Sequence, residues 1–124
     1  MVINPDRLQE VAMGDEEFLC ELIDLYLSDA PQQLEALGSA VSSLDAAAVS
    51  AAAHKLKGSC GNVGADGLVA LCQKLEGSAK ASRLQELPPL YEQLAREFEE
   101  VNETLHGVKA GSQPAAGKGS PEPV

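Results

Sequence analysis

Apolar residues recur at every third or fourth position over most of the chain, which is the spacing of helices that bury one face. The pattern predicts helices over about residues 4–13, 15–28, 31–43, 46–63, 66–82 and 87–106. Pro31 is interpreted as a helix boundary, because proline disfavours helical geometry in the residue before it and lacks an N–H donor. Asp45 is placed to cap the next helix and Gly64 to end it.

These elements predict an all-α fold. Short connections between consecutive helices favour antiparallel neighbours, so the last four long helices are expected to form an up-down antiparallel four-helix bundle with additional helices at the N-terminal end. Residues 1–106 are predicted to be one helical domain. Residues 107–124 consist mainly of Gly, Ala, Pro, Ser and Lys and are expected to be a disordered tail.

The helix predicted over residues 15–28 carries more apolar surface than one buried face requires. Its apolar residues span roughly 200° of the helix, whereas a stripe of about 100° is enough to face a core. The predicted first helix could cover the excess. Alternatively, an edge that includes Ile23 and Leu27 remains exposed as a docking patch for a partner protein.

Composition narrows the range of functions. A formal net charge of −10 argues against nucleic acid and against anionic membrane surfaces as partners. No segment has the ~20 apolar residues of a membrane span, and the first residues do not resemble a secretory signal, so a cytoplasmic location is expected. The three cysteines, Cys20, Cys60 and Cys72, lie on or beside apolar stripes without metal-ligand spacing, so neither a metal nor a cofactor is expected.

The helix predicted over residues 46–63 has an unusual polar face. His54 lies opposite the apolar stripe and shares its side of the helix with Lys57, Gly58 and Gly61. Each glycine weakens a helix by roughly 1 kcal/mol relative to alanine, but leaves the imidazole open to a large partner. The ammonium of Lys57 suits the oxygens of a phosphoryl group on His54.

The run His54-Lys55-Leu56-Lys57-Gly58-Ser59, with Asn62, Gly64-Ala65, Leu68, Leu71-Cys72 and Leu75-Glu76 after it, resembles the signature of histidine-containing phosphotransfer (HPt) domains. The resemblance implies that His54 is phosphorylated, that Lys57 steadies the phosphoryl group and that Gly58 keeps the ring accessible. It implies a His-Asp phosphorelay in which receiver domains of response regulators and a hybrid sensor histidine kinase are the partners. The protein would then be a carrier without an ATP-binding domain, and Mg²⁺ would be held by the receiver.

Two other functions fit the same residues. A hydrolase could use Cys60 with His54, although the two residues are about 120° apart on a helix. A docking or inhibitory module could bind a receiver domain or a kinase without carrying phosphate. Glu76 and Lys80 could orient the ring or a bound phosphate, or could be solvated surface residues. One exposed histidine in each bundle requires no dimer, so a monomer is expected.

Overall fold

The computed structural model describes residues 15–112, and within this range every regular element is a helix. The elements are α2 (Glu16–Ser42), α3 (Ala46–Asn62), α4 (Asp66–Lys80), the short 3-10 helix η1 (Leu84–Glu86) and α5 (Leu87–Ser112). The all-α prediction is therefore confirmed. The helix predicted over residues 4–13 lies outside the described residues, and no helix in the described part of the chain is long and apolar enough to cross a membrane.

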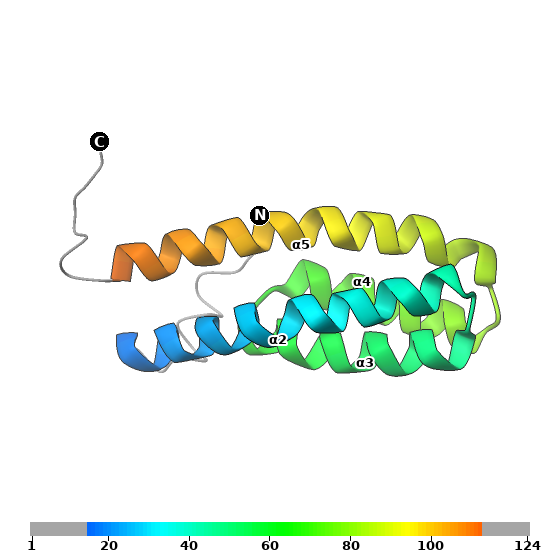
Figure 1. Cartoon of the computed structure of the whole chain (residues 1–124), viewed down its shortest axis with the longest axis horizontal. Helices are drawn as coiled ribbons and strands as arrows, with labels where there is room; N and C mark the ends of the chain where they lie inside the picture. Colours follow the sequence, from blue (N-terminus) through cyan, green and yellow to red (C-terminus); the bar gives the residue numbers. More distant parts are fainter. Residues whose placement is uncertain (1–14, 113–124) are drawn as a thin grey trace.

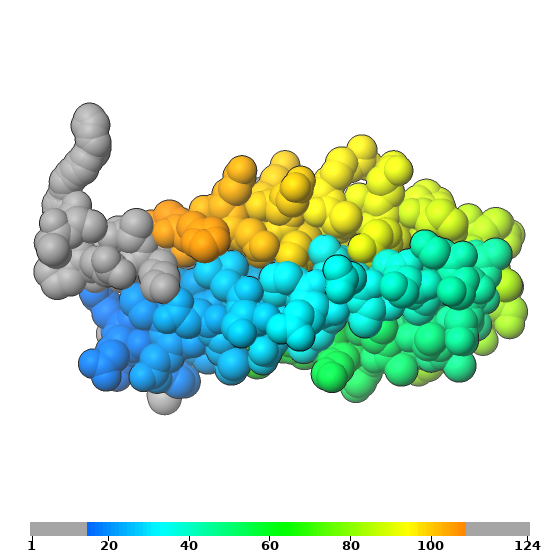
Figure 2. Space-filling view, in the orientation of Figure 1, coloured from blue at the N-terminus to red at the C-terminus, as the bar shows by residue number. Residues whose placement is uncertain are grey.

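The four long helices lie alongside one another (Figure 1). α3 packs against α2 and α4, and α5 packs against the same two helices. Viewed as spheres, the side chains of α2 and α5 meet along a continuous seam (Figure 2). Among the helices of residues 15–112, α3 and α4 make the most extensive contact, so their facing side chains are held in a defined register.

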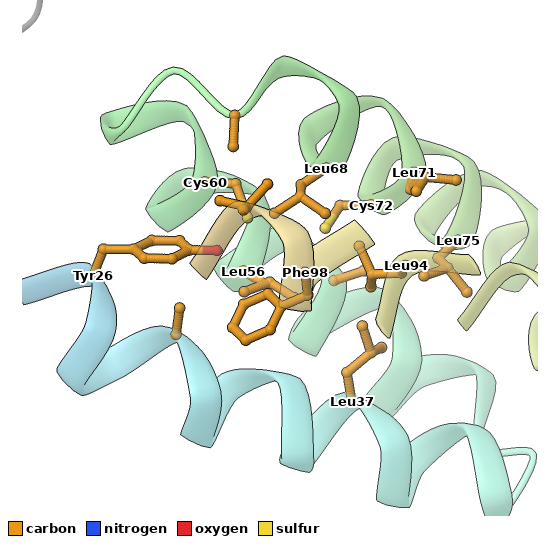
Figure 3. Packing of buried hydrophobic residues seen from close by; sticks show 14 of the residues in the cluster. Tyr26, Leu37, Leu56, Cys60, Leu68, Leu71, Cys72, Leu75, Leu94 and Phe98 are labelled. Atoms are coloured by element: carbon orange, nitrogen blue, oxygen red, sulfur yellow. The ribbon is translucent and has the colours of Figure 1, made fainter. Parts of the chain in front are cut away.

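The core runs between the helices and consists mainly of leucine, valine, alanine and cysteine. Ile23, Leu37, Leu56, Leu75 and Leu94 are among its fully buried side chains. Figure 3 shows residues from all four long helices meeting in this cluster. Burial of a leucine or isoleucine side chain stabilises a fold by about 1.5–3 kcal/mol, so the interface that places α3 against α4 is among the rigid parts of the protein.

The predicted break at Pro31 is wrong. α2 continues through Pro31, which is exposed, and residues on both sides of it, Ala30 and Leu37, are fully buried. The Gln32 side chain donates a hydrogen bond to the Ser28 carbonyl at 3.2 Å. A proline inside a helix costs about 3 kcal/mol, and burial along the whole length of α2 outweighs that cost.

Two other boundaries differ from the prediction. α4 begins at Asp66 as predicted but ends at Lys80 and not at residue 82, and Ala65 occupies its N-cap position without a side-chain hydrogen bond. α5 extends to Ser112, six residues beyond the predicted end at His106. Val108 lies one turn after the buried Leu105 and packs against the core, which favours continuing the helix past Gly107. Residues 107–112 are therefore helical, and residues 113–124 of the expected tail lie outside the described residues.

The caps of α3 agree with the prediction. The Asp45 carboxylate accepts a hydrogen bond from the Ala48 amide at 3.1 Å, which satisfies one of the free donors of the first turn. After α3 the chain turns at Val63–Ala65, where Gly64 has φ 71°. Glycine adopts this left-handed conformation without steric cost. The turn brings α4 back against α3, so residues of both helices reach one surface.

Two tyrosines allow a matched test of the packing. The Tyr26 hydroxyl is buried beside Cys60 without a hydrogen-bond partner among the described residues, and burial raises the pKa of Tyr26 (Figure 3). The Tyr91 hydroxyl donates to the Leu34 carbonyl at 3.2 Å. We expect Tyr26→Phe to leave the free energy of unfolding in urea unchanged or higher, and Tyr91→Phe to lower it by about 1 kcal/mol. Equal losses in the two variants would show that the Cys60 sulfur accepts a hydrogen bond from Tyr26.

Candidate functional site

His54 projects from the middle of α3 into solvent, with 67% of its side chain exposed. Its neighbours Ala53 and Leu56 on the same helix are fully buried, so the backbone under the imidazole is fixed by the core. The ring therefore stands on a rigid helix while its reactive edge remains accessible. This placement agrees with the position expected from the sequence.

The surface around His54 is nearly bare. A Cβ atom added to Gly58 or Gly61 would meet nothing within 4 Å, so both glycines face open space. Neither residue is required to be glycine by packing. The structure thus places an accessible imidazole on a flat helix surface that a second protein can approach closely.

Glu76 of α4 is the centre of the polar contacts beside His54. Its Oε2 atom lies 3.4 Å from Nδ1 of His54, and its Oε1 atom accepts a hydrogen bond from Nζ of Lys57 at 3.3 Å. Nζ of Lys80, one turn further along α4, lies 3.3 Å from Oε2. One carboxylate therefore contacts an imidazole and two ammonium groups.

The charges in this cluster keep Glu76 ionised. Only 14% of its side chain is exposed, and this burial raises the pKa of the carboxyl more than any other single influence. Hydrogen bonds from Lys80 and Lys57 and the charges of the two lysines together act in the opposite direction and are larger in sum, so the pKa of Glu76 lies below its ordinary value. At neutral pH the Glu76 carboxylate is therefore available as an acceptor for a protonated Nδ1 of His54.

The pairing with Glu76 decides which ring nitrogen is reactive. A neutral imidazole has one N–H donor and one acceptor nitrogen, and the partner of one nitrogen sets the state of the other. With Nδ1–H facing the carboxylate, Nε2 on the opposite side of the ring carries the free lone pair. The arrangement can therefore act as a nucleophile through Nε2.

Other residues singled out in the sequence have different positions. Ile23 is fully buried, so its interpretation as an exposed docking residue is wrong, and Leu27 is half-buried against the core. The large apolar side chains that α2 exposes are Phe18 and Leu25. The wide apolar surface predicted for residues 15–28 did not reveal which side chains face neighbouring helices, because that depends on where α3 and α5 lie.

A groove of about 450 Å³ lies between α2 and α3. Asp29 and Gln32 of α2 and Lys55 of α3 are among the residues that line it. Leu25 lies four residues before Asp29, hence on the same stripe of α2. Leu25 and the groove are therefore on the same side of α2.

The structure does not fit the alternative of a hydrolase that uses Cys60 with His54. Cys60 is fully buried and Cys72 lies beside it in the core (Figure 3). The hydrogen bond with the Cys60 thiol and burial raise the pKa of Cys72, so this second buried thiol is also disfavoured as a nucleophile. No group of three or more His, Cys, Asp or Glu residues within 15–112 has the arrangement of a metal site.

For Glu76 and Lys80 the sequence left two roles open, one beside the ring or a bound phosphate and one on the solvated surface, and the structure places both residues in the cluster beside His54. The spacing of four residues between Lys80 and Glu76 is visible in the sequence, but the contact of Glu76 with His54 depends on the packing of α4 against α3. The useful signal was the helical period of α4, which placed Glu76 and Lys80 at the edge of its apolar stripe.

Comparisons with known proteins agree with this geometry. The sequence model of the Hpt domain matches residues 21–105. The chain is 28% identical over 114 residues to the phosphorelay intermediate protein rdeA of Dictyostelium discoideum, and the match spans 92% of this chain but 45% of that protein. Its structure resembles the crystal structure of histidine-containing phosphotransfer protein B from Pseudomonas aeruginosa PAO1, with a TM-score of 0.81, 31% identity, and coverage of 87% of this chain and 94% of that chain.

Proposed function

The chain belongs to the Hpt domain family, and on this premise we propose that it is a phosphoryl carrier of a His-Asp phosphorelay. It accepts a phosphoryl group from a receiver-domain aspartate onto His54 and passes it to the aspartate of another receiver. The observation that carries the proposal is the exposed His54 ring whose Nδ1 faces the Glu76 carboxylate. The two similar proteins, a phosphorelay intermediate and a histidine-containing phosphotransfer protein, support the same role.

In the proposed reaction, the lone pair of Nε2 attacks the phosphorus of the aspartyl phosphate. An N–P bond forms while the bond from phosphorus to the aspartate oxygen breaks, and the aspartate leaves as a carboxylate. Nδ1 keeps its proton, so the phosphorylated ring carries a positive charge. The Glu76 carboxylate, 3.4 Å from Nδ1, offsets this charge. Transfer to the next receiver is the reverse reaction with a different aspartate.

Lys57 and Gly58 have separate roles in this scheme. Lys57 follows His54 by three residues on α3, with 27% of its side chain exposed, so its ammonium can move from Glu76 to the phosphoryl oxygens. Gly58 leaves room for the receiver's aspartate to reach the ring, and Gly61 extends the open surface by a turn.

Mg²⁺ is supplied by the receiver, and a hybrid sensor histidine kinase is the proposed source of the phosphoryl group. The monomeric state and the cytoplasmic location remain predictions.

We propose that α2, α3, α4 and α5 form an up-down antiparallel four-helix bundle. The contacts of α2 and α4 with both α3 and α5 support it, as does the colour order of Figure 1, which reverses direction from each long helix to the next. The family match over residues 21–105 supports a domain that takes up most of residues 1–106. The additional N-terminal helix remains part of the proposal.

The docking surface proposed for the receiver is the groove between α2 and α3 together with Leu25. We expect Leu25→Glu to weaken binding of a receiver domain about tenfold, because 57% of Leu25 is exposed and its burial by a partner is worth on the order of 1.5 kcal/mol or more. Affinity is measured by titration calorimetry. Leu44→Glu is the matched control, because Leu44 is another exposed leucine, in the turn after α2. Equal losses in both variants would contradict this location.

The function itself is tested by incubating the protein with several phosphorylated receiver domains and Mg²⁺. Intact mass is then measured in neutral buffer and again after brief acid treatment. A gain of one phosphoryl group that is lost in acid is expected, because the N–P bond of phosphohistidine is acid-labile. A folded protein that binds receivers but gains no phosphoryl group would instead indicate a docking or inhibitory module.

A further inference from the structure

The two oxygens of Glu76 have different cationic partners. Oε1 is contacted by Lys57, whereas Oε2 is contacted by both Lys80 and Nδ1 of His54, at 3.3 and 3.4 Å. Lys57 comes from the histidine helix α3, and Lys80 comes from α4, the helix of Glu76 itself. The oxygen that orients the ring is therefore the one that Lys80 neutralises.

This asymmetry matters once His54 carries a phosphoryl group. The phosphoryl oxygens attract Lys57 away from Oε1, and a carboxylate with one-seventh of its side chain exposed then lies close to a second anion. Without another cation, Glu76 would either retain Lys57 or turn away from the ring. The first outcome leaves the phosphoryl oxygens without their lysine, and the second leaves the charged ring without its carboxylate.

We propose that Lys80 is a positioning residue that acts through Glu76: it keeps the carboxylate paired and against Nδ1 while Lys57 moves to the phosphoryl group. The inference rests on the proposed phosphotransfer function and adds that the two lysines have different roles: Lys57 binds the phosphoryl group, and Lys80 stays paired with Glu76. Lys80 is suited to the static role, because its spacing of four residues from Glu76 on one helix holds the pair together. Its own side chain is 67% exposed, so it contributes little to the core.

The role predicts an effect on the phosphorylated state and not on docking. We expect Lys80→Gln to lower the equilibrium ratio of phosphorylated His54 to phosphorylated receiver by about threefold to fivefold, the range of an exposed ion pair. The affinity of the unphosphorylated protein for the receiver should not change. Lys80→Arg should restore the ratio, and the ¹⁵N shift of Nδ1 in phosphorylated protein should move in Lys80→Gln and return in Lys80→Arg.

Lys74→Gln is the matched control. Lys74 is an exposed lysine of the same helix, on the side that lines a groove with Pro89 and Leu90 of α5, so the variant removes the same charge away from His54. A double variant tests whether Lys80 acts through Glu76. In a Glu76→Gln background, Lys80→Gln should have no further effect on the ratio of phosphorylated His54 to phosphorylated receiver, because the carboxylate through which Lys80 acts is already absent.

The outcomes separate this inference from the function on which it rests. Equal effects of Lys80→Gln and Lys74→Gln, or an undiminished effect of Lys80→Gln in the Glu76→Gln protein, would overturn the positioning role while phosphotransfer by the unaltered protein still stands. If the unaltered protein takes up no phosphoryl group from any receiver, the function fails and the role of Lys80 falls with it.

Discussion

His54→Gln is expected to abolish phosphoryl uptake, with a loss of at least ~10³-fold that is limited by detection, because the glutamine amide has no nucleophilic nitrogen. The free energy of unfolding should stay within about 0.5 kcal/mol, because the side chain is largely exposed and makes no core contact. Uptake is followed by intact mass after incubation with a phosphorylated receiver and Mg²⁺. Receiver binding should survive, since the surrounding surface of α3 remains.

His106→Gln provides the matched control for this experiment. His106 is the other histidine of the chain and is exposed on α5, which packs against α2 and α4. The variant should accept a phosphoryl group as the unaltered protein does. If His54→Gln still gained an acid-labile phosphoryl group and His106→Gln did not, His54 would not be the carrier.

Gly58→Leu is expected to reduce the rate of transfer by about 100-fold or more while the fold is retained. The leucine side chain would stand one turn from His54 on the surface across which the receiver must bring its aspartate, and a displacement of about 1 Å from the reactive geometry can cost that much. Stability should rise by up to ~1 kcal/mol, because glycine is a weak helix former and a Cβ at this position meets nothing. Transfer is measured by rapid mixing with a phosphorylated receiver, and stability by urea unfolding.

Gly107→Leu distinguishes an effect on access from a general effect of replacing a helical glycine. A Cβ at Gly107 also meets nothing within 4 Å, but this residue lies on α5 and not on the histidine helix. The control should gain stability to a similar extent and keep its transfer rate. Unchanged transfer in Gly58→Leu would refute the argument that the bare surface serves access.

Most of the helical organisation could be predicted from the sequence, because it depends on local periodicity and end signals. The start of α3 after Asp45 and its end before Gly64 follow from capping chemistry within a few residues. The continuous α2 could not be predicted in this way. Local preference at Pro31 indicates a break, and only burial against α3 and α5, helices distant in sequence, outweighs it.

In the candidate site, too, some positions could be predicted from the sequence and others depend on how the helices pack. His54, Lys57 and Gly58 are close in sequence on one helix, so their shared face follows from the helical period alone. Glu76 is on another helix, and its position at Nδ1 depends on how closely α3 packs against α4. For the apolar residues of α2, periodicity showed an excess of surface but could not separate the buried Ile23 from the exposed Leu25.

The sequence by itself determined the nature of the chemistry: a histidine on a polar, glycine-bearing helix face, with a lysine one turn away. These features are properties of one helix, and a helix has a regular geometry that can be read from residue spacing. The tertiary structure alone decided that the Glu76 carboxylate lies at Nδ1 of His54 and pairs with Lys57. Both depend on atoms of α3 and α4 that approach within 3.3 to 3.4 Å, and such distances are set by the packing of a shared core.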